Sequence, residues 1–260
     1  MKESITKTIL YSGIVIISLT LSSFTLQKLI QKKEEKSENK GFAVLELFTS
    51  QGCSSCPPAD AVLGKYALQN NPNIIPLAFH VDYWNYIGWK DPFSKAEFSN
   101  RQRDYAKKMN TKGTYTPQVI INGKYELIGS KESEIQNKVT RELANPSKEN
   151  IAISEAVVTD GKLRINYNVK SISQSGVVNV ALVKKKEFTA IKRGENSGLK
   201  QTSYNIVVGF KTVPLQKKKM DAVEFDFPKE WLPSDFTVVA YSQSSLNGVT
   251  TAATQATIQN

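Results

Sequence analysis

Residues 44–60, VLELFTSQGCSSCPPAD, hold both cysteines of this 260-residue chain, Cys53 and Cys56. The apolar run 42–48 before them ends in TSQG, a pattern typical of a buried strand that runs into a turn. Beyond them, apolar residues at 59, 62, 63, 66 and 67 predict one face of a helix of about three turns. Because Pro57 and Pro58 are tolerated only in the first turn of a helix, both thiols are expected at its amino terminus.

The spacing of the two cysteines favours redox or metal chemistry over a structural staple. A disulfide that closes so short a loop removes little entropy from the unfolded chain. Backbone N–H groups and the helix dipole at a helix amino terminus stabilise a thiolate over a thiol. We therefore expect Cys53 to attack as a thiolate and Cys56 to resolve the mixed disulfide. Two such sulfurs also make half of a zinc site.

Further elements follow the cysteines in the order strand, helix, hairpin, helix. Residues 74–79 predict a second buried strand, and the apolar spacing in 94–109 predicts a surface helix. Asn122-Gly123 separates two short apolar runs, which is the strongest local signal for a β-hairpin. Apolar residues at 135, 139 and 143 predict a last helix, which ends at Asn145-Pro146.

The pattern changes after residue 146. Apolar residues at 163, 165, 167 and 169 alternate with polar ones, and Asp160-Gly161 joins this strand to 151–159 as a tight hairpin. Further strands are expected at 177–183, 204–210, 222–227 and 236–242. This half, residues 147–260, is therefore expected to form a small antiparallel β-sandwich.

The amino-terminal residues predict export. A short basic region, Lys2 to Lys7, precedes an uncharged apolar stretch, so residues 1–26 are expected to be a signal peptide or an amino-terminal anchor, with 9–26 as the possible membrane tether. Residues 27–40 are polar and charged, as in a linker. The protein is expected to be periplasmic or secreted. Its net charge of +10 is scattered along the chain, and no nucleic-acid partner is expected.

The order of these elements around the CxxC pair resembles that of thioredoxin-like folds. A strand, a CxxC at a helix start, a crossover strand and then Thr116-Pro117 before a hairpin carry this resemblance. It implies a cis peptide between Thr116 and Pro117, packed opposite the disulfide, which leaves the backbone of Thr116 free to pair with an extended substrate. The expected fold is thus an α/β thioredoxin-like domain with an inserted helix at 41–146, followed by the all-β sandwich.

Longer motifs resemble one exported bacterial family, domain of unknown function 1223. The motifs are residues 44–60, residues 80–93 (HVDYWNYIGWKDPF) and residues 115–118 (YTPQ), with a weaker match at 193–198 (RGENSG). The function of that family is not established, so the resemblance implies fold and export and leaves the substrate open.

Three titratable residues near the motif are candidates for a role in thiol chemistry. Glu46 lies in the strand before the cysteines and is expected to relay a proton to or from Cys56, with Asp82 as a second candidate. His80, the only histidine, either tunes the thiolate or completes a copper(I) or zinc site with Cys53 and Cys56. The remaining alternative for each is a structural role.

Aromatic residues follow His80 directly. Tyr83 and Trp84, with Tyr86 and Trp89 beyond them, are expected to grip an extended polypeptide beside the disulfide, or else to fill the gap under the inserted helix. Arg193, Glu195 and Asn196 are expected to form a turn that docks the two halves, with a substrate role as the alternative.

The leading hypothesis is an exported thiol-disulfide oxidoreductase that acts on protein thiols or disulfides of the cell envelope, with Cys53–Cys56 as its redox centre and no other cofactor. An alternative is a copper(I) or zinc protein that uses Cys53, Cys56 and His80. A third is a non-catalytic envelope binding module.

Overall fold

The computed structural model describes residues 41–170, 175–215 and 220–259, and residues 41–260 form one compact unit. The expected signal or anchor, 1–26, and the linker, 27–40, lie outside the described residues. Within the described part of the chain, none of the helices combines the length and the apolar character that a membrane span requires.

The first half of the unit alternates strands and helices, and the second half consists of strands. Its regular elements in chain order are β1 (Ala43–Thr49), α2 (Pro57–Leu68), β2 (Ile74–His80), η1 (Asn85–Ile87), α3 (Ala96–Met109), β3 (Gln118–Ile121), β4 (Tyr125–Ile128), α4 (Glu132–Leu143), β5 (Asn150–Thr159), β6 (Lys162–Lys170), β7 (Gly176–Ala190), β8 (Lys200–Pro214), β9 (Met220–Asp226), η2 (Pro233–Asp235), β10 (Phe236–Ser244) and β11 (Thr250–Thr257).

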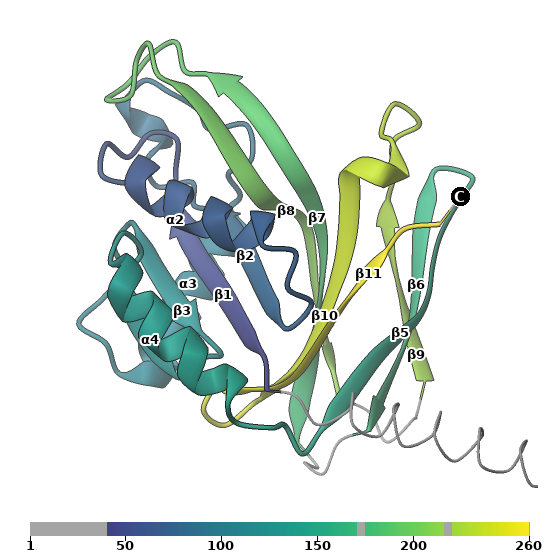
Figure 1. Cartoon of the computed structure of the whole chain (residues 1–260). Coiled ribbons are helices and arrows are strands. Elements are labelled where there is room, and N and C mark those ends of the chain that lie inside the picture. The colour runs from purple at the N-terminus through teal and green to yellow at the C-terminus, as the bar shows by residue number, and fades with distance from the viewer. Residues whose placement is uncertain (1–40, 171–174, 216–219, 260) are drawn as a thin grey trace, which may run out of the picture. The chain divides into compact units, whose positions relative to one another are not determined.

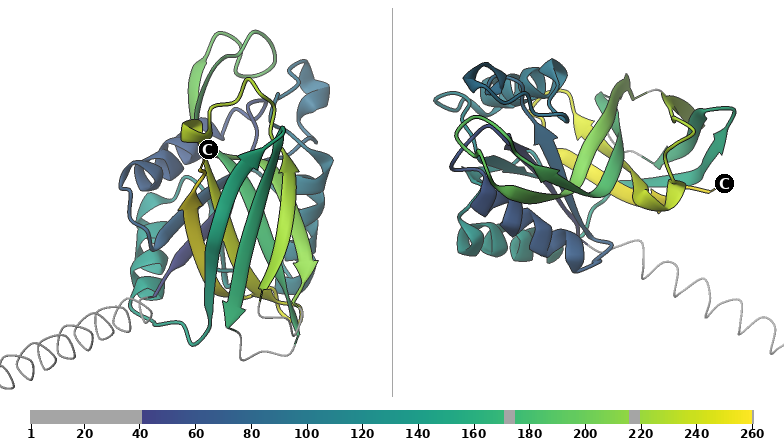
Figure 2. Two further views of the ribbon diagram at one scale, coloured as in Figure 1. Left: turned by 90° about the vertical axis from the view of Figure 1, so that its right-hand side faces the viewer. Right: turned by 90° about the horizontal axis from the view of Figure 1, so that it is seen from above.

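These strands form two sheets. The larger one has eight strands in the order β11-β10-β7-β8-β2-β1-β3-β4, and β5-β6-β9 form the smaller one. β1 pairs in parallel with β2 and antiparallel with β3, and β2 meets β8 at Ala78 and Ile206. Figure 1 shows β7, β8 and β10 between the first half of the chain and the smaller sheet. Figure 2 shows the smaller sheet stacked on the larger one.

The expected fold class, a thioredoxin-like domain followed by a separate all-β sandwich, is wrong. The strands of the second half do not make a sandwich of their own, because β7, β8, β10 and β11 continue the sheet that β1–β4 begin. Only β5, β6 and β9 form the opposing layer. The chain is therefore built around one large mixed sheet that both halves share.

The reason lies in the two buried faces of β7 and β10. On β7, Val178, Val180 and Leu182 face the core between the two sheets. The intervening Ala181 and Val183 face a second core, under α3, with residues of β1 and β2. Because successive side chains of a strand point to opposite faces, a strand that buries apolar side chains on both faces belongs in a central layer. The sequence of this run, VVNVALV, does not by itself distinguish a strand of a separate sandwich from a central strand of the large sheet.

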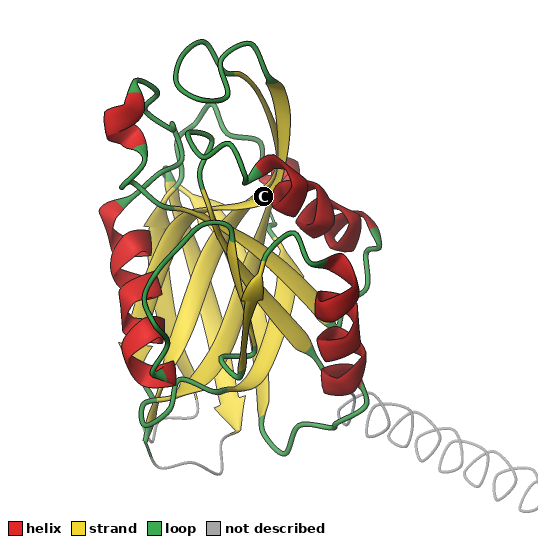
Figure 3. Ribbon diagram, turned by 90° about the vertical axis from the view of Figure 1, so that its left-hand side faces the viewer, coloured by secondary structure: helices red, strands yellow, loops and turns green. Residues whose placement is uncertain are grey.

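The local elements expected from turn and helix signals are present. The hairpins at Asn122-Gly123 and Asp160-Gly161 have positive φ at all four residues, as their turns require. Helices α2, α3 and α4 occupy the predicted segments, and Figure 3 shows helices on two sides of the strands. α3 covers the core that β1, β2, β7 and β10 share, and α2 and α4 cover a third core on the other face of β1.

A buried ion pair connects the two halves beneath α3. Arg101 of α3 donates to both carboxylate oxygens of Glu46, at 2.6 and 2.9 Å, and to the Tyr241 hydroxyl of β10 at 2.9 Å. The Tyr105 hydroxyl donates to Glu46 at 2.5 Å. The Glu46 side chain is 2% exposed, so its charge depends on this partner.

Replacing Glu46 by Gln leaves the Arg101 guanidinium buried without its counter-charge. We expect the free energy of unfolding to fall by about 3 kcal/mol, the range seen when one partner of a buried pair is removed. Urea titration of the purified protein measures this change.

The matched control is Glu224→Gln, which removes a carboxylate from the exposed pair with Arg164 on β6. An exposed pair contributes little, so a change within about 0.5 kcal/mol is expected. Equal losses for the two variants would contradict the stabilising role of the Glu46–Arg101 pair.

Candidate functional site

The two cysteines form a disulfide at the start of α2. Cys53 and Cys56 are bonded with their Cα atoms 5.4 Å apart. Cys56 is the N-cap residue of α2, followed by Pro57 in the first turn, and its carbonyl accepts the backbone N–H groups of Ala59 and Asp60. Both cysteines are fully buried, at 0% exposure, whereas Ser54 and Ser55 between them are exposed. The cysteines therefore lie at the start of α2, as predicted, but Cys53 is no more exposed than Cys56.

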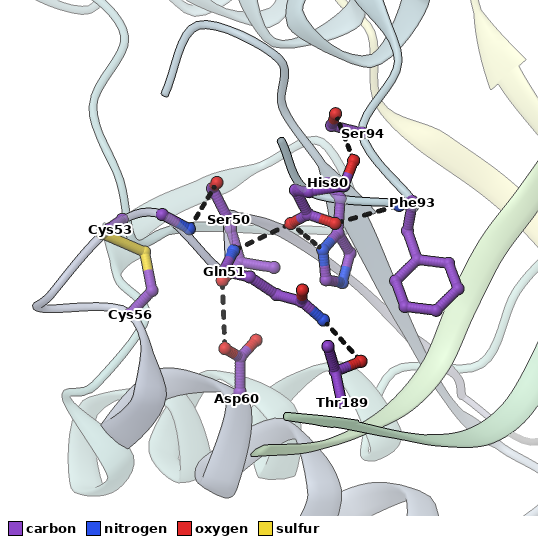
Figure 4. A network of polar contacts seen from close by, with 12 residues as sticks. Ser50, Gln51, Cys53, Cys56, Asp60, His80, Phe93, Ser94 and Thr189 are labelled. Atoms are coloured by element: carbon purple, nitrogen blue, oxygen red, sulfur yellow. Dashed lines mark hydrogen bonds and ion pairs between the residues drawn. A yellow bond between two sulfur atoms is a disulfide. The ribbon is translucent and has the colours of Figure 1, made fainter. Parts of the chain in front are cut away.

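Hydrogen bonds hold the turn that presents the disulfide. The Cys53 amide donates to the Ser50 carbonyl at 3.1 Å, and the Gly52 amide donates to the Ser50 hydroxyl at 3.1 Å. The Gln51 amide donates to a carboxylate oxygen of Asp91 at 2.8 Å. This turn and its polar neighbours are drawn in Figure 4. The turn is thus anchored to a buried acid of the segment after β2.

Asp91 also binds His80, and the two form a fully buried pair at the end of β2. His80 Nδ1 lies 2.7 Å from the same Asp91 oxygen that accepts the Gln51 amide. Burial by itself would lower the pKa of His80, but the charge and hydrogen bond of Asp91 outweigh it and raise that pKa above its ordinary value. Burial would likewise raise the pKa of Asp91, and the charge of His80 lowers it. The two pKa shifts are thus opposite in direction, and each has the other residue of the pair as a cause.

A second buried acid, Asp60, lies on α2 one turn after Cys56. Its carboxylate accepts hydrogen bonds from Thr49 Oγ1 at 3.2 Å and from Gln201 Nε2 at 2.7 Å. Burial raises its pKa to about 6, against the lowering effect of His80 and of the two hydrogen bonds. Residues four apart on a helix are neighbours on one face, so Asp60 and Cys56 share a face of α2.

The peptide between Thr116 and Pro117 is cis, as the resemblance implied. The Ser55 hydroxyl reaches the Thr116 carbonyl at 3.5 Å, so this segment lies beside the CxxC turn. Next to it opens a cleft of about 870 Å³, whose lining includes Ser55, residues 110–117, Glu126 and Ile128. A surface of this size beside the disulfide is suited to a bound polypeptide segment.

Tyr83 and Trp84 hold the Thr116 segment in place. Trp84 Nε1 donates to the Thr116 hydroxyl at 2.7 Å. The Tyr83 hydroxyl donates to Gln102 Oε1 at 3.0 Å, and Gln102 Nε2 in turn donates to the Tyr115 carbonyl at 2.7 Å. Both aromatic side chains therefore form hydrogen bonds within the protein. Trp84 binds Thr116 directly, and Tyr83 is connected to Tyr115 through Gln102.

The structure does not bring Glu46 or Asp82 to the disulfide. Glu46 points into the core under α3, while its neighbours Leu45 and Leu47 point to the core under α2. Asp82 accepts a hydrogen bond from the Ser99 hydroxyl of α3 at 2.5 Å. Buried carboxyls do lie near the CxxC turn, but they are Asp60 and Asp91.

The β7–β8 loop (Ile191–Leu199) lies directly on the CxxC turn. The Asn196 side-chain amide donates to the carbonyls of Gln51 and Cys53, both at 2.9 Å. The Ser54 amide donates to a carboxylate oxygen of Glu195 at 3.1 Å. Glu195 and Asn196, expected in a docking turn, thus contact the redox motif itself. The structure gives no such contact for Arg193.

Sequence reasoning assigned no role to Asp60, Asp91, Gln51 or Gln201. Asp60 carried a usable signal, since it stands four residues after Cys56 in an otherwise apolar stripe of α2. Asp91 and Gln201 carried none, because their contacts with the site come from a loop and from a strand far along the chain. Only the fold brings them together.

Over residues 41–170, 175–215 and 220–259, no three His, Cys, Asp or Glu side chains come together as a group that would hold a metal ion. The structure therefore does not assemble Cys53, Cys56 and His80 as ligands. The nearest partner of His80 is Asp91, and the two sulfurs are bonded to each other.

The raised pKa of Asp60 predicts a pH-dependent effect of Asp60→Asn on stability. The folded protein binds the Asp60 proton more tightly than the unfolded chain does, so this carboxyl contributes stability that is full below pH 3.8 and is lost as the pH rises through about 6. Relative to the wild type, the free energy of unfolding of Asp60→Asn should rise by about 3 kcal/mol over that window. Urea titrations at a series of pH values from 3.5 to about 7 measure it.

Asp226→Asn is the control of opposite sign. The hydrogen bond from Lys162 lowers the pKa of this exposed carboxyl, so its contribution is lost as the pH falls. A difference curve for Asp60→Asn that is flat, or that slopes as the Asp226→Asn curve does, would show that Asp60 is not a destabilised buried acid.

Known proteins resemble this chain in sequence and fold. The model of the family described as "protein of unknown function (DUF1223)" matches residues 44–243. Protein AGR_C_4864 of Agrobacterium tumefaciens is 25% identical, with a TM-score of 0.63 over 84% of this chain and 94% of that one. HBP35 of Porphyromonas gingivalis is 14% identical, with a TM-score of 0.61 over 84% of this chain and 76% of that one, which shows a shared fold. No curated protein sequence matches the chain. From the family match, the chain belongs to the DUF1223 family.

Proposed function

We propose that this protein is a thiol-disulfide oxidoreductase that exchanges the Cys53–Cys56 disulfide with thiols or disulfides of other proteins. The observation that carries the proposal is the disulfide between its only two cysteines, closed at the first turn of α2. There the positive end of the α2 dipole stabilises a thiolate at Cys53, which is the reactive form in exchange. A disulfide that serves mainly to stabilise the fold is expected to close a longer loop, because its stabilising effect grows with loop length.

The reaction proceeds in two exchange steps. In the reduced protein, the Cys53 thiolate attacks one sulfur of a substrate disulfide, forms a mixed disulfide and releases the other substrate sulfur as a thiolate. Cys56, as a thiolate, then attacks Cys53, closes the Cys53–Cys56 disulfide and releases the second substrate sulfur. Two electrons pass to the substrate. The released thiolates take up the two protons that the Cys53 and Cys56 thiols gave up. The reverse sequence oxidises a substrate dithiol.

Cys56 must lose its proton inside the protein, since it is fully buried. Asp60 is the group that takes this proton in our proposal, in place of Glu46. It shares a face of α2 with Cys56, and its pKa of about 6 suits a group that accepts and returns a proton near neutral pH. Thr49 and Gln201 hold its carboxylate in place.

The cleft beside the disulfide is the proposed binding site for the substrate. Ser55, Thr116 and Pro117 border it on the side of the disulfide, and Tyr115 and Ile128 supply partly exposed apolar surface. An extended polypeptide that binds along Thr116 brings its own sulfur toward Cys53. We propose exported proteins of the cell envelope as the substrates, in line with the expected export signal at 1–26.

Single cysteine variants separate the two steps. Cys56→Ser retains the attacking thiol and lacks the resolving one, so the reduced variant should accumulate a stable mixed disulfide with glutathione when it is treated with oxidised glutathione. Cys53→Ser should form less adduct, because Cys53 Sγ lies 3.3 Å from the hydroxyl of Ser55, an exposed residue at the edge of the cleft, whereas Cys56 is the N-cap residue of α2. Intact-protein mass spectrometry resolves the adduct of each variant.

The wild type is the control, and it should return to the Cys53–Cys56 disulfide without a lasting adduct. If the adduct formed equally on both variants, the assignment of Cys53 as the attacking thiol would be incorrect. If neither the variants nor the wild type reacted, the protein would be a binding module with an inert disulfide.

A further inference from the structure

The β7–β8 loop contributes a carboxylate and an amide to the CxxC turn from the other half of the chain. We propose that Glu195 is a positioning residue of the exchange site, which tunes the reactivity of the Cys53 thiolate through the Ser54 amide. The consequence for exchange rests on the proposed function, but the effect on the thiol does not.

A direct hydrogen bond places Glu195 at the residue that follows Cys53. One oxygen of Glu195 accepts the backbone N–H of Ser54, the residue that follows Cys53, at 3.1 Å. Asn196 anchors the same stretch from the other side, through the carbonyls of Gln51 and Cys53 at 2.9 Å each. Adjacent residues of the loop thus bind three backbone groups of the turn that carries Cys53: the carbonyls of Gln51 and Cys53 and the amide of Ser54.

The loop itself is held in one conformation. Its ends are joined by the hydrogen bond from the Ile191 amide to the Leu199 carbonyl at 2.9 Å, and by the one from the Gly198 amide to the Ile191 carbonyl at 2.8 Å. Gly194 has φ +77°, and a Cβ at this position would come within 3.1 Å of Trp89 Cβ, so the backbone requires glycine here. Glu195 is therefore presented to Ser54 from a loop with little freedom.

The Gln51 side chain fastens the base of the loop to the site. Its oxygen accepts Trp89 Nε1 at 3.1 Å, and its nitrogen donates to the Thr189 hydroxyl at 3.0 Å, next to the end of β7. The residue that precedes Gly52 and Cys53 in the turn thus binds both the segment after β2 and the hairpin that carries Glu195. This linkage makes the loop part of the site.

The charge of Glu195 opposes the helix terminus. The positive end of the α2 dipole stabilises a negative sulfur, and a carboxylate bound to the neighbouring Ser54 amide destabilises it. Glu195 therefore raises the pKa of the Cys53 thiol. It also disfavours the reduced protein relative to the disulfide, because the reduced form carries the thiolate.

Glu195→Gln tests the charge while keeping an oxygen that accepts the Ser54 amide. We expect the pKa of the Cys53 thiol to fall by about 0.5, because a unit charge several ångströms away through water has an effect of that order. The thiolate fraction at a pH below the pKa should rise about threefold. The pH dependence of iodoacetamide alkylation of the reduced protein, read at Cys53 by peptide mass spectrometry, measures both.

Two further variants complete the test. Glu224→Gln removes the same charge from the smaller sheet and should leave the alkylation profile of Cys53 unchanged. Glu195→Ala should lower the pKa at least as far as Glu195→Gln. The proposal is overturned if Glu195→Gln has the wild-type profile, if Glu224→Gln produces the same shift, or if only Glu195→Ala changes it, since the last result would indicate docking of the loop without an effect of charge.

This experiment is independent of the proposed function. Iodoacetamide reacts with the Cys53 thiolate whether or not the protein exchanges disulfides with a partner. A shifted profile together with no exchange with oxidised glutathione would retain Glu195 as a residue that tunes the thiol and reject the oxidoreductase. A wild-type profile together with mixed-disulfide formation would reject the role of Glu195 and retain the oxidoreductase.

Discussion

The burial of β7 and β10 on both faces is the constraint on which the rest of the structure depends. Their alternate side chains fill two different cores, one shared with the smaller sheet and one shared with α3. Neither strand has a stable place at the surface, so the second half of the chain must complete the sheet that the first half begins. The hairpin of β7 and β8 then extends to the start of α2, where its loop meets the CxxC turn. The architecture of the site is thus a consequence of the core.

The polar groups beneath that turn depend on the same arrangement. Burial makes Asp60 a costly carboxyl, and Gln201 from β8 offsets part of this cost by supplying one of its two hydrogen bonds. His80 and Asp91 bind each other. The Asp91 oxygen that contacts His80 also accepts the hydrogen bond from the Gln51 amide. The CxxC turn therefore lies over a layer of buried titratable side chains that bind one another or polar neighbours.

Local structure was predictable from the sequence, and the assembly of distant segments was not. The helix start at the cysteines, the two hairpins and the Thr116-Pro117 segment follow from turn chemistry, from apolar spacing and from the family resemblance. The strand β7 was predicted but misplaced, since a mostly apolar run of this length fits a sandwich strand as well as a central one. Glu46 was expected to relay a proton to Cys56, but its side chain binds Arg101 under α3, and alternation within β1 does not show which core lies on which side. Asp91 and Gln201 reach the site only through the fold.

The complete burial of Cys53 and Cys56 is compatible with exchange. Three hydrogen bonds fasten the β7–β8 loop to the backbone of the CxxC turn. Each contributes about 1 kcal/mol net, so lifting the loop costs about 3 kcal/mol and leaves on the order of one molecule in a hundred open at equilibrium. In the proposed exchange, that population is large enough for reaction with a bound partner, and it slows the reaction of the sulfurs with small thiols and disulfides. A partner that replaces the contacts of Asn196 at the carbonyls of Gln51 and Cys53 recovers part of this cost, so the closed loop favours substrates that bind the turn over those that merely collide with it.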